Sequence, residues 1–282
     1  MVNFLKYKWV YFILSLTLIF VGVYSIFTWG FRFSIEFTGG TNLSFVFEKK
    51  PETSSLRKFF EREKIEVKEI RIKEKRAFVK TQRLSEEKIK NLEKKLKAKL
   101  EKYETVGPSI SREFKDKTLI AAVLSVLAIL IYITFAFKSL SFAFAAILAA
   151  LHDSLILFGS YSLLSKFFGF EFDTLFVSAV LTTLSFSVHD TIVVFDKIRE
   201  YKREFGEADL EYYANKALTE TMVRSINNSL TIIFMLVALL IFGGETIKGF
   251  VWALLIGTIS GTYSSPFIAT PLAVIFERIR RK

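Results

Sequence analysis

Residues 9–29 read WVYFILSLTLIFVGVYSIFTW, and residues 30–48, which follow directly, read GFRFSIEFTGGTNLSFVFE. The first stretch has no charged side chain and matches the roughly 20 apolar residues that a membrane-spanning helix needs. The second alternates apolar and polar side chains on both sides of a TGGT turn, which is the pattern of a strand pair. The sequence therefore predicts a membrane span that leads directly into a folded polar domain.

Five further stretches are long and apolar enough to span a membrane, and they cover residues 118–137, 141–164, 174–195, 226–242 and 250–276. Of the 282 residues, 51% are hydrophobic and 24% charged, and the two kinds are segregated along the sequence. We therefore predict a polytopic α-helical membrane protein with six transmembrane helices. The first run is longer than the apolar core of a secretory signal and no small-residue cleavage site follows it, so we expect an uncleaved first span.

Lys and Arg in the termini and short connections predict which side of the membrane each segment faces. Two of them, Lys166 and Lys248, lie on the side opposite the amino terminus, against twelve on the same side. Both termini are then expected in the cytoplasm and residues 30–117 outside it, since long loops cross regardless of charge. The twelve are Lys6, Lys8, Lys138, Lys197, Arg199, Lys202, Arg203, Lys216, Arg278, Arg280, Arg281 and Lys282.

Residues 30–117 have the patterning of an α+β domain. Gly39 and Gly40 are assigned to the first turn, because glycine tolerates positive φ, and Ser85 is a suitable cap for a helix. After the first hairpin strand, the predicted order is β-α-β-β-α-β, which is typical of a ferredoxin-like domain between spans one and two. The predicted strands are 31–37, 42–48, 67–73, 76–81 and 106–110, and the predicted helices are 54–64 and 85–103.

The predicted domain is basic, with 24 Lys and Arg against 15 Asp and Glu. Acidic residues are interspersed with the basic ones and aromatic side chains do not interleave with them, so we reject a nucleic-acid interface. The chain has no cysteine and no GxxxxGK[ST] motif, which excludes disulfides, Cys-based metal sites and a P-loop ATPase. We expect no cofactor and no metal, and any energy use is expected to draw on an ion gradient or a partner.

Ionisable side chains inside the spans are costly in lipid and are the natural candidates for a functional site. Asp153 lies in the third span and Asp190 in the fourth, each preceded by a histidine, and Arg224 lies at the start of the fifth. At 1.5 Å per residue, Asp190 and Arg224 lie about 24 Å and about 28 Å from the predicted outer surface, in the same inner layer. Two hypotheses follow: a structural ion pair, or a pair that responds to protonation of Asp190.

Neighbouring polar residues favour a hydrogen-bonded interior between spans four and five, namely Thr182, Thr183, Ser185, Ser187, Asn227 and Asn228. A serine hydrolase built on Ser185 and His189 is disfavoured, because a serine and a histidine on one helix rarely align for proton transfer. A metal held by the pairs His152-Asp153 and His189-Asp190 is disfavoured as well, because polar contacts between packed helices are far commoner. Gly257 and Gly261 form a GxxxG motif, which predicts a close-packed helix seam.

Six spans with one large domain after the first resemble one half of a resistance-nodulation-division exporter. More specifically, the chain resembles the SecF family, the membrane subunits of the bacterial SecD–SecF protein-translocation complex. The resemblance rests on SIEFTGGT at 34–41, LHDSL at 151–155, SVHDTIVVFDKIRE at 187–200 and TETMVRSINNSLT at 219–231.

The resemblance implies a non-enzymatic subunit of the Sec translocase in the cytoplasmic (inner) membrane. With SecD, it would use the proton-motive force to help secreted preproteins leave the SecYEG translocon, and it leaves room for further small membrane subunits. It implies that Asp190 and Arg224 take part in ion coupling, and it leaves the ion open between proton and sodium. Asp153 and Asn227, as polar residues within the spans, are assigned a supporting role. His189 stands where asparagine is usual. It either tunes Asp190, because histidine changes charge most readily near neutral pH, or only replaces asparagine as a hydrogen-bonding side chain, and we assign it to the coupling residues.

Two other functions stay open: a half-subunit of an exporter of small molecules or lipids, and a scaffold of the translocon without transport. The exporter would need an internal repeat with about twelve spans in one chain. The expected organisation is an amino terminus with the first span at 1–29, the domain at 30–117, spans two to six at 118–276 with a cytoplasmic loop at 196–225, and a basic cytoplasmic tail at 277–282.

Overall fold

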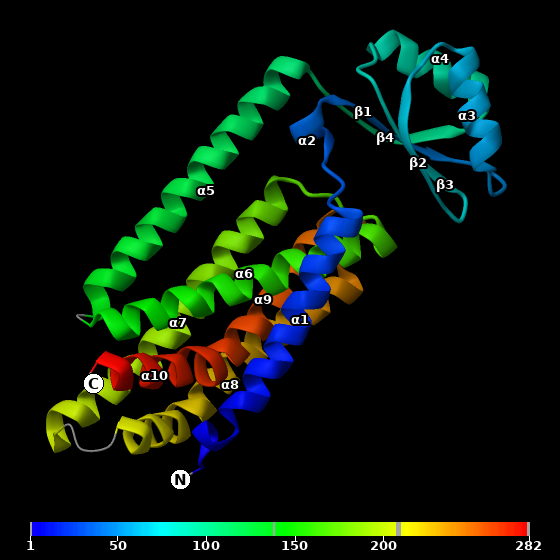
Figure 1. The fold of residues 1–282 in the computed structure, drawn as a ribbon. Helices are drawn as coiled ribbons and strands as arrows, with labels where there is room; N and C mark the ends of the chain where they lie inside the picture. Colours follow the sequence, from blue (N-terminus) through cyan, green and yellow to red (C-terminus); the bar gives the residue numbers. More distant parts are fainter. Residues whose placement is uncertain (1, 138, 207–209, 281–282) are drawn as a thin grey trace. The chain divides into compact units, whose positions relative to one another are not determined.

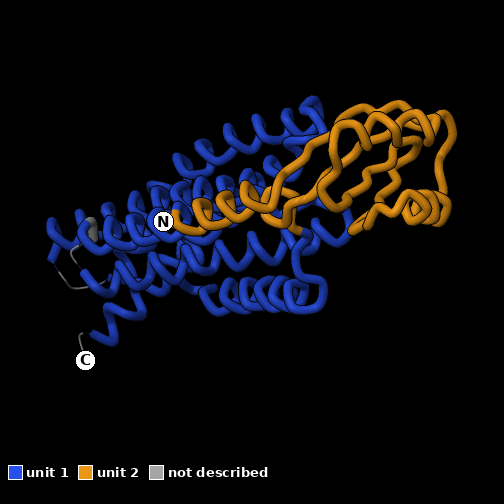
Figure 2. The backbone as a smooth tube through the Cα atoms, turned by 90° about the horizontal axis from the view of Figure 1, so that it is seen from above, with its two compact units in different colours: residues 1–32, 121–282 blue, residues 33–120 orange. Residues whose placement is uncertain are grey.

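The computed structural model describes residues 2–137, 139–206 and 210–280. The chain divides into two compact units, coloured separately in Figure 2. Met1–Arg32 and Ala121–Lys282 form the first, called here the helical unit, and Phe33–Ile120 form the second, called the sheet unit. Each unit has a hydrophobic core of its own.

The helical unit consists of long helices (Figure 1). Among the described residues, six helical segments are long and apolar enough to cross a membrane, in agreement with the six predicted spans. The elements are η1 (Phe4–Tyr7), α1 (Lys8–Trp29), α5 (Pro108–Phe137, which begins in the sheet unit), α6 (Leu140–Phe168), α7 (Thr174–Phe205), α8 (Leu210–Phe242), η2 (Glu245–Ile247), α9 (Lys248–Ser264), the π-helical turn η3 (Ser265–Ala269) and α10 (Thr270–Arg280).

Helices α1 and α6 pack at very short range through small residues. A Cβ atom added to Gly159 would lie 2.4 Å from the Cα atom of Gly22, so a side chain on either glycine would push the two backbones apart. Farther along the same seam, Ser25 Oγ donates to Ser162 Oγ at 2.9 Å. Close approach of small residues with hydrogen bonds between them is the usual way in which membrane helices associate.

The predicted GxxxG seam lies between α9 and α7. A Cβ atom on Gly257 would lie 2.3 Å from Thr183 Cγ2, and one on Gly261 would lie 3.0 Å from Ser187 Cβ. The seam brings α9 close to the part of α7 that carries Ser187 and, three residues later, Asp190. The glycines therefore determine which polar side chains of α7 and α9 can reach one another.

The segment predicted as a cytoplasmic loop, residues 196–225, is helical over most of its length. Helix α7 continues to Phe205 and α8 begins at Leu210, while residues 207–209 lie outside the described residues. The charged side chains of this region are good helix formers, and they pair with one another. Tyr201 donates to Glu220, and Lys202 Nζ lies 3.1 Å from Glu277 Oε1.

The predicted tail at 277–282 also belongs to a helix as far as it is described. Helix α10 continues to Arg280, and residues 281–282 lie outside the described residues. Glu277 is fully buried and accepts from Arg280 at 2.6 Å as well as from Lys202. The end of the sixth span is therefore tied to α7 by a buried carboxylate.

The sheet unit contains a four-stranded antiparallel sheet in the order β2-β3-β1-β4. Its elements are α2 (Ile35–Thr38), β1 (Gly40–Val46), α3 (Thr53–Arg62), β2 (Val67–Lys73), β3 (Arg76–Thr81), α4 (Glu86–Leu96) and β4 (Lys99–Val106). The two longer helices contribute Leu56, Phe60, Ile89 and Leu92 to a core with strand residues such as Phe45. Strands β2 and β3 have the predicted bounds, because their alternation is bounded by clear turns.

The strand predicted at 31–37 is wrong, because Ile35–Thr38 form a short helical turn. Thr38 Oγ1 donates to the carbonyl of Ser34 at 3.1 Å, and the Gly39 N–H donates to the carbonyl of Ile35 at 2.8 Å. Local hydrogen bonds of this kind compete with strand pairing. Alternating apolar residues therefore did not suffice to specify a strand here.

The secondary structure predicted for the last third of the domain also differs from the observed structure. Ser85 caps α4 as predicted, accepting from the Lys88 N–H, but the helix ends at Leu96 because Lys97 takes a left-handed conformation with φ 50°. The residues predicted as the end of that helix form β4 instead, with Leu100 opposite Phe45 of β1. The strand predicted at 106–110 is wrong as well, because α5 begins at Pro108, and proline is favoured in the first turn of a helix.

Candidate functional site

A cavity of about 200 Å³ lies between α7 and α8. Helix α7 presents two consecutive polar residues to it and, one turn later, two valines, while α8 presents polar residues alone. The lining residues are His189, Asp190, Val193, Val194, Thr221, Arg224, Ser225 and Asn228. Three of the predicted coupling residues, His189, Asp190 and Arg224, therefore lie around one cavity.

Asp190 is the buried acid of this cavity, with 5% of its surface exposed. Ser225 of α8 donates a hydrogen bond from Oγ to Asp190 Oδ2. A carboxyl group shielded from water in this way is stable only with hydrogen-bond donors or a counter-charge nearby. The contact with Ser225 fixes the carboxyl group at the boundary between α7 and α8.

Arg224 lines the same cavity, but its side chain is exposed. Within residues 2–137, 139–206 and 210–280 it forms no ion pair, so the carboxylate of Asp190 and the guanidinium are neighbours without direct contact. His189 is exposed too and makes no hydrogen bond to another described residue. The two side chains predicted to form a pair therefore occupy one cavity with space between them.

Both Asn227 and Asn228 were predicted to face a polar interior, with Asn227 as the supporting residue, and Asn228 is the one that lines the cavity. Thr221 and Ser225, which also line it, were not singled out from the sequence. Thr221, Ser225 and Asn228 are spaced by four and three residues, which places them on one face of a helix. Asn227 is exposed on a different part of α8. Helical spacing counted from Arg224 reaches both Asn227 at i+3 and Asn228 at i+4, so spacing alone does not decide between them.

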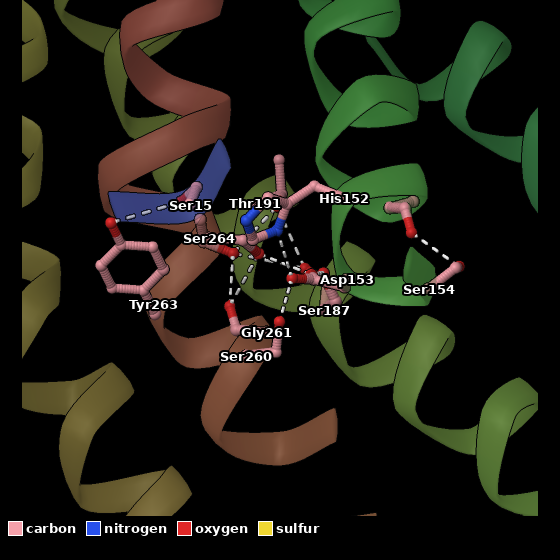
Figure 3. A network of polar contacts seen from close by, with 12 residues as sticks. Ser15, His152, Asp153, Ser154, Ser187, Thr191, Ser260, Gly261, Tyr263 and Ser264 are labelled. Carbon is pink, nitrogen blue, oxygen red and sulfur yellow. Dashed lines mark hydrogen bonds and ion pairs between the residues drawn. The ribbon is translucent and has the colours of Figure 1, made fainter. Parts of the chain in front are cut away.

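A second polar centre surrounds Asp153 on α6 (Figure 3). Asp153 Oδ1 accepts from Ser260 Oγ at 2.6 Å, and Oδ2 accepts from Ser187 Oγ at 2.5 Å and Ser264 Oγ at 2.6 Å. Figure 3 shows the three serines pointing toward Asp153 from α7 and α9. Asp153 is only 5% exposed, and its carboxylate is held by hydroxyl donors from two other helices.

His152 completes this centre. Its Nδ1 lies 3.0 Å from Asp153 Oδ1, and its ring stacks at 6.4 Å on Tyr263 of α9. Its Nε2 is buried and has no hydrogen-bond partner among the described residues. The hydroxyl of Tyr263 donates to the carbonyl of Tyr11 at 3.1 Å, which links the centre to α1.

A row of hydroxyl contacts extends from this centre along α7. Thr191 Oγ1 lies 2.9 Å from Ser265 Oγ, at the first residue of the π-helical turn, and donates to the carbonyl of Ser187 at 3.0 Å. Ser187 and Thr191 stand on the two sides of Asp190 in the sequence. Beside Asp190, α7 is thus held by hydrogen bonds to α6 and η3.

The predicted turn glycines lie in the sheet unit. Gly39 and Gly40 both have positive φ, 65° and 129°, and they connect α2 with β1. A Cβ atom on Gly40 would lie 2.4 Å from the carbonyl oxygen of Thr81 on β3. Their role is therefore to let β1 start close beside β3, without a chemical group of their own.

No group of three or more His, Cys, Asp or Glu side chains that could hold a metal ion was found in the described parts of the chain. The pairs His152-Asp153 and His189-Asp190 belong to different centres, one on each side of α7. Fold and site together define a multi-pass membrane protein that keeps three carboxyl groups buried among its helices, those of Asp153, Asp190 and Glu277.

The chain matches the family model described as protein export membrane protein SecD/SecF, C-terminal, over residues 85–279. It is 40% identical to a protein translocase subunit SecF of Thermobaculum terrenum, over 98% of this chain and 94% of that one. It is 35% identical to a protein translocase subunit SecF of Sebaldella termitidis, over 98% and 92%. The chain therefore belongs to the SecD/SecF protein-export family, and within it to the SecF subunits.

The solved structures agree with this assignment. The crystal structure of SecDF, a translocon-associated membrane protein from Thermus thermophilus, superposes with a TM-score of 0.87 at 33% identity over 98% of this chain. A second structure, of SecDF in the super-membrane-facing form, superposes with a TM-score of 0.68 at 30% identity over 99%. This chain spans 39% of each of the two SecDF chains.

Proposed function

We propose that this chain, together with SecD, uses the proton-motive force to assist the export of preproteins through SecYEG. Membership in the SecF subunits supports a role in protein transport and not in catalysis. Asp190, Arg224 and His189 are the proposed ion-coupling residues. Asp153 and Asn227 are the proposed supporting polar residues within the membrane, to which the lining of the cavity adds Asn228.

The observation that carries this proposal is the separation between Asp190 and Arg224 across one cavity. A buried carboxyl group held by a single serine can exchange a proton without breaking an ion pair first. When Asp190 is charged, it attracts the guanidinium across the cavity, and when it is protonated this attraction is lost. A local change of charge can thus favour one of two arrangements of α7 and α8.

We further propose the inner membrane as the location, with both termini in the cytoplasm and the sheet unit outside as a ferredoxin-like domain. The unequal distribution of Lys and Arg supports the orientation. The strand order β2-β3-β1-β4 and the chain order β1-α3-β2-β3-α4-β4 support the ferredoxin-like assignment of Phe33–Ile120.

SecD is the proposed partner. The apolar segments of α5 and α8 leave most of their side chains uncovered, and α8 also exposes Arg224 within a span. A charge facing lipid costs at most about 3 kcal/mol on insertion scales, the value at the centre of a span, so this face is stabilised by a protein partner or water. The protein translocase subunit SecDF of Thermus thermophilus matches this chain over 36% of the SecDF length. The rest of that protein supports the proposal of a separate SecD partner for this chain.

The test is Asp190→Asn, which keeps the shape of the side chain and removes its titration. Export of a preprotein is measured in inner-membrane vesicles, with and without an imposed proton gradient. We expect the variant to assemble with SecD and to lose the gradient-dependent part of export. The exposed Asp116, which lies outside both buried centres, provides the same substitution as a control, and Asp116→Asn should behave like the wild type. A full response of Asp190→Asn to the gradient would reject the proposal.

A further inference from the structure

A second cavity, of about 180 Å³, lies where α1 begins and α10 ends. Two of its lining residues are cationic, Lys8 and Arg278, and the other three are aliphatic, Val274, Ile275 and Ile279. It lies apart from the cavity of Asp190, with which it shares no residue. Its apolar walls and its two positive charges together match a ligand that is anionic at one end and apolar at the other.

The positive charge of this cavity is only partly balanced by the protein. Arg278 Nη2 lies 3.1 Å from Glu211 Oε2, in a pair whose arginine side chain is 65% exposed. Lys8 forms no ion pair with any residue that the structure describes. The neighbouring acid on α10, Glu277, is already engaged with Lys202 and Arg280. One positive charge therefore remains available at the cavity, together with a weakly held arginine.

The sequence places this cavity at the edge of the membrane. Lys8 immediately precedes the uncharged stretch 9–29, and Arg278 follows the apolar stretch 250–276. Trp9, next to Lys8, is 66% exposed, and exposed tryptophan beside lysine is typical of the level of the lipid headgroups. The cations thus lie at headgroup level and the aliphatic walls at the level where acyl chains begin.

We propose that this cavity binds the headgroup of an anionic phospholipid, with the phosphate between Lys8 and Arg278 and the upper acyl chain against Val274, Ile275 and Ile279. The volume equals that of about six water molecules, which suits a phosphodiester group and excludes a whole lipid. Basic pockets between membrane helices on the cytoplasmic side are suited to acidic headgroups. A bound lipid would fasten the start of the first span to the end of the last.

The experiment measures lipid bound to the purified full-length chain by native mass spectrometry in a mild detergent. Phosphatidylglycerol and phosphatidylcholine with identical acyl chains are added in parallel, with inorganic phosphate as a competitor. We expect the chain to retain phosphatidylglycerol in preference to phosphatidylcholine, and Lys8→Gln to reduce the retained phosphatidylglycerol about fivefold, the effect of one basic residue near an anionic surface. Lys8→Arg, which keeps the charge, should retain the lipid.

Lys6→Gln is the matched control, because Lys6 is exposed, lies two residues away and does not line the cavity. Equal losses in Lys6→Gln and Lys8→Gln would overturn the proposal, since the attraction would then be diffuse. Equal retention of the two lipids by the wild type would overturn it too. Displacement of phosphatidylglycerol by millimolar inorganic phosphate would assign the cavity to free phosphate and reject the lipid.

Discussion

Replacement of Asp153 by alanine tests whether the serine-lined centre holds the helical unit together. Three hydrogen bonds reach this carboxylate from other helices, one from Ser187 on α7 and two from Ser260 and Ser264 on α9. Hydrogen bonds between membrane helices average about 0.6 kcal/mol each, with a maximum of about 1.7 kcal/mol. We therefore expect Asp153→Ala to lower the free energy of unfolding by about 2 kcal/mol, or about 30-fold in the unfolding equilibrium constant.

Titration with sodium dodecyl sulfate in mixed micelles, followed by tryptophan fluorescence, measures this loss. Trp29 at the end of α1 and Trp252 on α9 report on helices that the centre connects. Asp153→Asn should lose about half as much, because it keeps one acceptor oxygen and the serine hydroxyls can turn toward it. Unlike Asp190→Asn, both variants should keep a gradient response once assembled, since the Asp153 centre lies outside the proposed coupling cavity.

Ser154→Ala is the control for this experiment. Ser154 follows Asp153 on α6 but donates to Ala150 of its own helix at 2.8 Å, and Figure 3 shows it pointing away from the centre. Its replacement should change stability by less than about 0.5 kcal/mol. Identical unfolding curves for Asp153→Ala and Ser154→Ala would refute the view that the serine contacts stabilise the fold.

Two further outcomes are expected. Gly159→Ala should destabilise the helical unit by about 1–3 kcal/mol in the same titration, because its Cβ would lie 2.4 Å from Gly22 Cα. The control, Gly244→Ala, should have little effect, because nothing lies within 4 Å of its Cβ. Equal unfolding curves for the two variants would contradict the close approach of α1 and α6. Arg224→Lys should keep part of the gradient-dependent export and Arg224→Met none, because lysine keeps the charge without the planar guanidinium, and an active methionine variant would remove Arg224 from the mechanism.

The comparison of Asp190 with Asp153 shows which features of the site could be predicted from the sequence. Counting residues along two antiparallel spans placed Asp190 and Arg224 in one layer of the membrane, and both line one cavity. The same count gave no information about Asp153, whose partners Ser260 and Ser264 lie more than 100 residues away in the sequence. Depth follows from helical rise, which is a local property, whereas partners depend on which helices are neighbours.

In the sheet unit, too, some secondary structure follows from the local sequence and some depends on tertiary contacts. Residues 67–73 and 76–81 became strands as predicted, because each alternating run ends at a turn. Leu100 fits a helix that carries Ile89, Leu92 and Leu96 equally well, and only its position opposite Phe45 makes it part of β4. An apolar residue at a spacing allowed by both periods does not specify its own secondary structure.

The sequence by itself determined the number of apolar segments long enough to span a membrane, the position of the sheet unit in the chain, and the burial of Asp153 and Asp190. Lipid imposes these features, because it requires about 20 apolar residues per span and penalises every charge within it. The tertiary structure decided that α9 packs on α7 through Gly257 and Gly261, and that this contact surrounds Asp153 with hydroxyl groups. Such contacts depend on the fit between helix surfaces, which the order of residues along a single helix does not encode.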